Sequence, residues 1–221
     1  MPALPQPPLL VITDRTQARR PLEEIADTVF AAGCRWLLLR EKDLSTGKRL
    51  ALTHRLSRLA KEHGAKLLVS ADIEAARQAD GVHLPRDGNV RAARAALGPE
   101  ALIGFSAHDL AEARDAAEAG ADYVTLSPIY ESASKPGYGP ALGLETVRQV
   151  ASILSVPVLA LGGVTAGNAG TCLAAGAAGV AVMGEIMRAD APEAVVAELL
   201  ASLRQDEADA GQDRDTAAEC G

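Results

Sequence analysis

The chain has 221 residues, which is enough for one large domain or two small ones. Its hydrophobic content of 48% and charged content of 23% are those of an ordinary soluble globular protein, and aromatic residues make up only 3%. The net charge of -7, with no long basic run, disfavours nucleic acid and anionic membranes as partners.

The two ends of the chain differ in composition from the rest. The Pro-rich residues 1–8 and the acidic residues 204–221 show no apolar periodicity, so we expect both to be disordered around a catalytic domain at 9–203. No stretch approaches transmembrane length and no signal-peptide pattern is present, which favours a cytoplasmic protein with no membrane partner. The three cysteines are scattered without CxxC spacing, so neither a zinc site nor a disulfide framework is predicted.

Short apolar runs alternate along the chain with stretches of helical periodicity. Eight runs are predicted to be strands: Leu9–Thr13, Arg35–Arg40, Ala65–Ser70, Gly81–Pro85, Ala101–Ser106, Asp122–Ser127, Pro157–Gly162 and Gly179–Met183. Because these runs are continuously apolar, they are typical of parallel strands that are covered on both faces.

A helical pattern follows each predicted strand. The predicted helices are Pro21 to about Gly33, Lys48–His63, Ile73–Gln78, Val90–Leu97, Leu110–Ala119, Leu144–Leu154, Ala169–Ala175, a short helix from Gly184, and Pro192–Leu203. Eight strand–helix units predict an α/β fold, a single (β/α)₈ TIM barrel. A doubly wound sheet is the alternative, but that fold does not require an eighth unit.

In such a barrel the chemistry lies at the carboxyl ends of the strands. Arg40 and Lys42 alternate on one extended strand end, so both can point toward the barrel mouth. Together with Lys135 they would favour a phosphate or diphosphate ligand. The alternative is that Arg40 and Lys42 form surface salt bridges with Glu41 and Asp43.

Glycines follow the last two predicted strands. Gly162 and Gly163 come after the seventh strand, and Met183 and Gly184 come at the end of the eighth. Glycine lets the backbone approach a ligand closely, and a helix N-terminus offers free N–H groups, so these positions predict a phosphate site. The alternative is a tight turn with no ligand.

Two histidines and two aspartates also lie near strand ends. His83 and His108 are candidates for general acid or base, or for structural imidazoles near the mouth. Asp72 and Asp87 follow neighbouring strands and are candidate Mg²⁺ ligands, or simply helix caps.

The segment Ser127–Gly143 is long and polar for a loop inside a compact domain, which is typical of a binding loop or an active-site lid. Its hydroxyls Ser132 and Ser134 stand beside Lys135. We interpret these three side chains as groups that hold a ligand over the mouth.

The chain resembles the thiamine-phosphate synthase family and its close relative, thiazole tautomerase, over roughly Leu9 to Leu203. The resemblance rests on the order and spacing of six segments: LLLREK, DGVHLP, IGFSAH, GADYVTLSPIYESASKPG, PVLALGGV and GVAVMGEI. The synthase joins a pyrimidine-methyl diphosphate to a thiazole phosphate and releases pyrophosphate. The resemblance therefore implies phosphorylated small-molecule substrates, Mg²⁺ as cofactor and a homodimer.

The resemblance also implies roles for individual residues. Arg40 and Lys42 match the family's basic pair, and Ser106 matches a serine near the leaving diphosphate. Three further matches fall in the lid and the thiazole-phosphate site: Ser132, Ser134 and Lys135 for the Thr-x-Thr-Lys lid, Gly163 and Gly184 for the phosphate.

Several positions depart from the synthase pattern. Leu38 stands where the synthase usually has Gln, Ser70-Ala71-Asp72 replaces Asn-Asp, and Asp87 comes one position early. A tautomerase is the alternative, but Pro128 stands where its catalytic histidine would lie, and His108 would have to substitute. A barrel that binds a thiazole or a phosphate without turnover is the third possibility.

Overall fold

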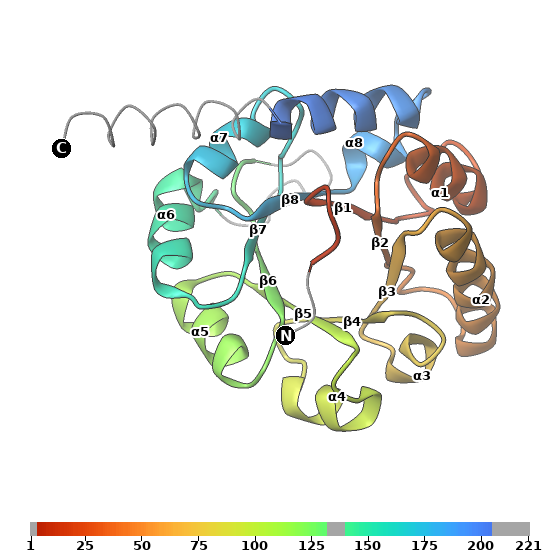
Figure 1. Cartoon of the computed structure of the whole chain (residues 1–221), viewed down its shortest axis with the longest axis horizontal. Helices are drawn as coiled ribbons and strands as arrows, with labels where there is room; N and C mark the ends of the chain where they lie inside the picture. The colour runs from red at the N-terminus through yellow and green to blue at the C-terminus, as the bar shows by residue number, and fades with distance from the viewer. Residues whose placement is uncertain (1–3, 132–139, 205–221) are drawn as a thin grey trace.

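The computed structural model describes residues 4–131 and 140–204. Its strands are all parallel and close into a barrel in the order β1 to β8, with β1 hydrogen-bonded to both β2 and β8. Figure 1 looks down the barrel, with the strands forming the inner ring and the helices surrounding it. The predicted single (β/α)₈ barrel is confirmed.

The elements follow the predicted order with small changes at their ends. The strands are β1 Leu9–Ile12, β2 Trp36–Leu39, β3 Lys66–Ser70, β4 Gly81–Leu84, β5 Leu102–Ala107, β6 Tyr123–Leu126, β7 Val158–Leu161 and β8 Gly179–Val182. The helices are α1 Leu22–Ala31, α2 Thr46–Glu62, α3 Ile73–Ala76, α4 Val90–Leu97, α5 Leu110–Glu118, α6 Gly143–Ile153, α7 Ala169–Ala174 and α8 Gly184–Met187. Residues 192–204 are also helical.

Each strand contributes side chains to two apolar layers, because successive residues point to opposite faces. In β1, Leu9 and Val11 pack outward against the helices, whereas Leu10 and Ile12 point into the barrel. The interior cluster also holds Trp36, Leu38, Leu68, Leu102, Tyr123, Leu159 and Ala181. The barrel interior is therefore a packed core, and a ligand has to bind at its mouth.

Residues 4–8 lie against the barrel, and the expected disorder of residues 1–8 stays a prediction. Leu4 packs against the interior cluster, and the Pro8 carbonyl accepts a hydrogen bond of 3.0 Å from the Val180 amide. Residues 1–3 and 205–221 lie outside the described part of the chain, so the expected disorder of residues 204–221 stays a prediction. In the described part of the chain, no helix has the length and apolar character needed to cross a bilayer.

Candidate active site

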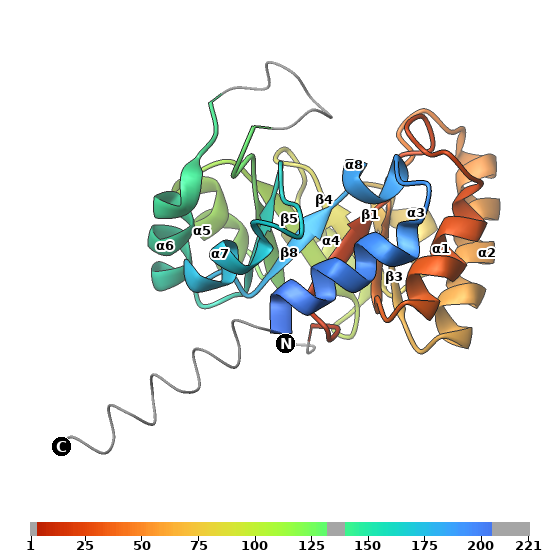
Figure 2. The same cartoon turned by 90° about the horizontal axis from the view of Figure 1, so that it is seen from above.

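The mouth of the barrel is the end at which the strands finish and the loops to the following helices begin. In Figure 2 this end is uppermost, with α8 lying beside it, and the N-terminus lies at the lower end. The predicted residues Arg40, Gly162 and Met183 each directly follow the carboxyl end of a strand, and Ser106 lies one residue before the end of β5.

Arg40 meets Met183 across β1. Its amide donates to the Thr13 hydroxyl at 3.0 Å, which holds the backbone, and its guanidinium Nη1 lies 4.0 Å from Met183 Sδ. Within residues 4–131 and 140–204, no ion pair engages the Arg40 guanidinium. The structure thus brings two predicted site residues together, and the ligand-binding role of Arg40 stays a prediction.

Glu41 and Asp43 both pair with Arg15 rather than with the predicted basic pair. The buried Glu41 carboxylate accepts from the Thr13 hydroxyl at 2.7 Å and lies 3.7 Å from Arg15 Nε, while Asp43 pairs with Arg15 Nη2. Burial raises the pKa of Glu41. The salt bridges considered as an alternative role for Arg40 are therefore not formed, and Lys42 lies exposed beside them.

Asp72 is a helix cap and one half of an ion pair. Its Oδ1 accepts from the Ala75 amide at 3.0 Å, and its Oδ2 accepts from Arg49 Nη1 at 2.6 Å. Arg49 also donates to the Leu44 carbonyl at 2.7 Å, so it ties the loop after β2 to the loop after β3. The helix-cap interpretation of Asp72 is confirmed.

The predicted magnesium ligands do not fit a metal site. Both oxygens of Asp72 are engaged by Arg49 and by the Ala75 amide, and Asp87 lies exposed on a different loop. Among the residues that the structure describes, no three His, Cys, Asp or Glu side chains converge. Asp72 is thus oriented toward the Arg49 guanidinium.

The Asp72–Arg49 pair predicts acid-sensitive stability. Burial acts to raise the pKa of Asp72, but the Ala75 amide bond and the bond and charge of Arg49 outweigh it and hold this pKa below 3.8. Because the folded-state pKa is depressed, the stabilisation is present above pH 3.8 and is lost as the pH falls through the lowered pKa. Asp72→Asn keeps a capping side chain and removes the charge, so we expect a loss of about 1–2 kcal/mol near pH 7.

Urea denaturation at several pH values checks this expectation. The difference between wild type and Asp72→Asn should narrow as the pH falls below 3.8. Asp109→Asn is the matched control, because Asp109 caps α5 through the Glu112 amide at 2.8 Å without an ion pair in the described residues. A pH-independent difference for Asp72→Asn would contradict the role given to Arg49.

Ala71 adopts a backbone conformation that suits asparagine better. Its φ of 62° is left-handed, and among the described residues it is the only non-glycine with a positive φ. Asn tolerates this region more readily than Ala, so Ala71→Asn should raise the free energy of unfolding by about 0.5–1 kcal/mol. Ala51→Asn, on the exposed face of α2, should lower it instead. Equal effects of both substitutions in urea melts would refute the strain argument.

Ser106 is held by a chain of hydrogen bonds from the barrel interior. Its hydroxyl lies 2.9 Å from His83 Nε2, and His83 Nδ1 lies 2.9 Å from the Tyr123 hydroxyl. His83 is buried, and desolvation lowers its pKa to about 4. His83 is thus a structural imidazole near the mouth, which is one of the two roles that the sequence suggested for it.

Tyr123 was not among the predicted site residues. Its hydroxyl reaches His83 because Gly104 stands between them: a Cβ at Gly104 would lie 2.4 Å from His83 Nδ1 and 2.2 Å from Tyr123 Cζ. Gly104 pairs in register with His83 on one side and Tyr123 on the other. The sequence signal for this cluster is a glycine on β5 whose paired residues on the two flanking strands, β4 and β6, are a histidine and a tyrosine.

His108 is oriented by the end of β6. Its Nδ1 lies 2.7 Å from the Ser127 carbonyl, which only accepts, so Nδ1 carries the proton. Its amide donates to Glu112 Oε2 at 2.8 Å. His108 directly follows β5, two residues beyond Ser106 on the same strand, and its acid–base role stays a prediction.

Gly162 and Gly163 support the segment that follows β6. Both have positive φ, and a Cβ at Gly163 would lie 2.4 Å from the Glu131 carbonyl oxygen. The Tyr130 amide donates to the Gly162 carbonyl at 3.0 Å. The close approach predicted for these glycines is therefore made to the backbone of Tyr130 and Glu131. Their phosphate-binding role, like that of Gly184 at the start of α8, stays a prediction.

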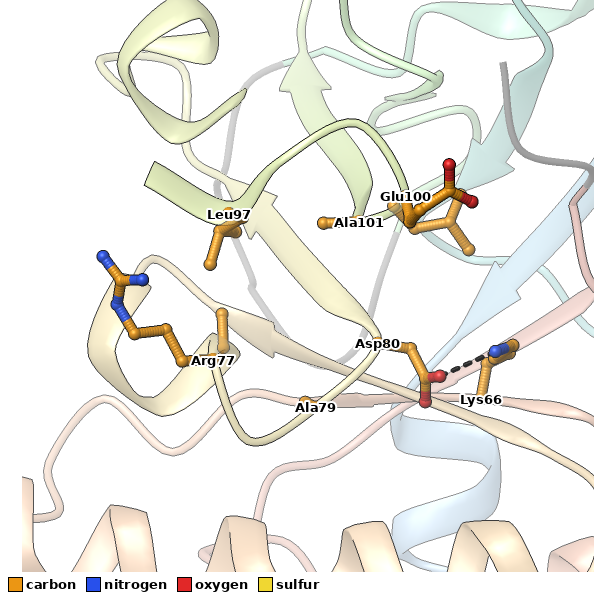
Figure 3. Close-up of a pocket in the computed structure, with 9 residues that line it drawn as sticks. Lys66, Arg77, Ala79, Asp80, Leu97, Glu100 and Ala101 are labelled. Carbon is orange, nitrogen blue, oxygen red and sulfur yellow. Dashed lines mark hydrogen bonds and ion pairs between the residues drawn. The ribbon is translucent and has the colours of Figure 1, made fainter. Parts of the chain in front are cut away.

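The lid residues Ser132, Ser134 and Lys135 lie outside the described residues, so their predicted role is not tested. A pocket of about 560 Å³ is lined by Lys66, Arg77, Asp80, Glu100 and other residues, with Lys66 and Asp80 joined at 2.7 Å (Figure 3). Because Lys66 and Leu102 begin their strands, this pocket is at the opposite end from the mouth.

Comparison with known proteins identifies the family. A family model described as thiamine monophosphate synthase matches residues 9–186. The chain belongs to the thiamine monophosphate synthase family. It is 36% identical over 208 residues to a thiamine-phosphate synthase of Roseiflexus sp., covering 91% of this chain and 88% of that one.

Other members of the family differ in length and overlap. The chain is 40% identical over 185 residues to the thiamine biosynthesis bifunctional protein ThiM/ThiE of Symbiobacterium thermophilum, of which it spans only 38%. A solved structure of the family, thiamine phosphate pyrophosphorylase from Pyrococcus furiosus, superimposes with a TM-score of 0.81 at 28% identity. That superposition covers 90% of this chain and 96% of the other.

Proposed function

We propose that the protein is a thiamine-phosphate synthase, a transferase of thiamine biosynthesis. It would join hydroxymethylpyrimidine diphosphate to a thiazole phosphate and release pyrophosphate. The observation that carries this proposal is the Arg40 guanidinium, which stands at the mouth without an ion-pair partner in the described chain. A fixed positive charge at that place suits a leaving diphosphate.

The proposed reaction needs an anion-stabilising site more than an acid or a base. The C–O bond between the pyrimidine methylene and the diphosphate breaks, and the diphosphate leaves with the electron pair. The lone pair of the thiazole nitrogen then forms the new C–N bond, and the product ring carries the positive charge. Arg40 would neutralise the departing oxygens, and Ser106 would donate a hydrogen bond to them.

The remaining predicted site residues complete this proposal. Lys42 and the lid group Ser132, Ser134 and Lys135 would add charge and hydroxyls around the diphosphate. Gly162, Gly163, Met183 and Gly184 would hold the thiazole phosphate through backbone N–H groups and an apolar contact. We also propose a homodimer from the family resemblance, which light scattering of the purified chain would test.

Incubation of the purified chain with both substrates, followed by an assay for thiamine phosphate, tests the proposed function. Parallel reactions with Mg²⁺ and with a chelator keep magnesium as a variable, because Asp72 and Asp87 do not form a ready metal site. No product from folded protein would reject the synthase. Isomerisation of a thiazole carboxylate phosphate would indicate a tautomerase, and binding of thiazole phosphate without turnover would indicate a binding protein.

A further inference from the structure

A hydrogen-bonded chain leads from the barrel interior to the mouth. It runs from the Tyr123 hydroxyl through the His83 ring to the Ser106 hydroxyl, with both contacts at 2.9 Å. Tyr123 is fully buried, and its ring is fixed edge-on against Trp36 with centroids 4.8 Å apart. Ser106 is the only one of the three that is partly exposed.

The direction of the hydrogen bonds follows from the donors and acceptors present. Within the described residues, the Tyr123 hydroxyl has no partner except His83 Nδ1. If Nδ1 carried the ring proton, the phenol hydrogen would be left buried without an acceptor, which is unfavourable. The phenol therefore donates to Nδ1, and the proton of the neutral ring is on Nε2.

This tautomer decides what Ser106 does. Nε2–H donates to the Ser106 oxygen, with the Thr125 hydroxyl oxygen farther away at 3.4 Å. Ser106 then accepts from His83 and keeps its own hydrogen for another acceptor. In the opposite tautomer Ser106 would donate to His83, and only its oxygen lone pairs would face the mouth.

We propose that Tyr123 and His83 are positioning residues that turn Ser106 into a hydrogen-bond donor for an oxygen of the diphosphate. This inference rests on the proposed function, since it deepens the role of the same site. The low pKa of His83, caused by its burial, keeps the ring neutral at ordinary pH and so preserves one fixed tautomer. This hydrogen-bonded relay, formed by Tyr123, His83 and Ser106, thereby orients the neutral Ser106 hydroxyl as a hydrogen-bond donor toward an anion.

Nitrogen-15 NMR of the whole chain tests the tautomer without any need for turnover. The chain has four histidines, and the His83 signals are assigned by comparison with His83→Asn. We expect Nδ1 of His83 to resonate as an unprotonated ring nitrogen and Nε2 as a protonated one. A protonated Nδ1 in the wild type would overturn the relay, whatever the activity of the protein.

Titration with inorganic pyrophosphate tests the consequence for anion binding. Tyr123→Phe removes only the phenol oxygen, and we expect it to weaken pyrophosphate binding by roughly three- to tenfold. In a Ser106→Ala background the same substitution should change the affinity less than about twofold, because the donor is already absent. Equal losses in the two backgrounds would show a general structural effect and would overturn the proposal.

Kinetics of the same four proteins separate this inference from the proposed function. Tyr123→Phe should lower kcat by about tenfold with little change in KM, and it should have little effect once Ser106 is Ala. The chain could lack synthase activity while the His83 tautomer and the pyrophosphate affinities of the four proteins are as expected. In that case the proposed function fails and the relay stands. If turnover is normal in Tyr123→Phe, the relay is rejected and the synthase stands.

Discussion

Replacing Arg40 with Ala should lower the rate of thiamine phosphate formation by roughly 10²–10³-fold, as removal of one transition-state donor does elsewhere. Arg40 has no ion-pair partner among the described residues, so its charge contributes little to the folded state. The free energy of unfolding should therefore change by less than about 1 kcal/mol. The loss should fall mainly on kcat, because the charge on the leaving group grows as the bond breaks.

Steady-state kinetics and urea denaturation of the same preparations measure both quantities. Arg58→Ala is the matched control, since Arg58 lies exposed on α2 and pairs weakly with Glu62 at 3.7 Å. The control should retain wild-type kinetics. An Arg40→Ala variant with unchanged kcat would remove the guanidinium from the reaction and would undermine the synthase proposal itself.

Gly104→Ala should destabilise the protein by about 3 kcal/mol, the upper end of the range for overpacking a core. The new methyl group would lie 2.2 Å from Tyr123 Cζ and 2.4 Å from His83 Nδ1. Neither ring can move away freely, because Tyr123 is packed against Trp36 and His83 is buried among neighbouring strands. A chain of this size should then melt roughly 6–12 °C lower.

Gly47→Ala provides the control for this substitution. A Cβ at Gly47 would meet nothing within 4 Å, and the residue lies in the first turn of α2. Alanine is the better helix former there, so the free energy of unfolding should rise by up to about 1 kcal/mol. Calorimetry that found Gly104→Ala as stable as wild type would mean that the interior has room for a methyl group, contrary to the packing described above.

The sequence predicted the barrel because the fold depends on features that repeat. Each unit carries its own apolar run and its own helical pattern, and eight units fill a barrel. The position of a residue at a strand end was also predictable, which is why Arg40 and Met183 could be assigned to the mouth before their 4.0 Å contact was known.

Individual pairings between loops were not predictable in the same way. Arg49 and Asp72 are 23 residues apart, and Arg15 and Glu41 are 26 apart. Which guanidinium a carboxylate meets depends on how the loops bend over the mouth, and residue types alone do not specify that. The sequence leaves Asp72 as a helix cap or a metal ligand, whereas the structure engages both of its carboxylate oxygens.

The packing of residues 4–8 against the barrel has a consequence for attaching the protein to a surface. Leu4 covers the interior cluster at the lower end of the barrel, and Figure 2 places the N-terminus at the end away from α8. A linker joined ahead of Leu4 would anchor the molecule by its closed base. Immobilised in this way, the barrel would present its mouth to the surrounding solution rather than to the surface.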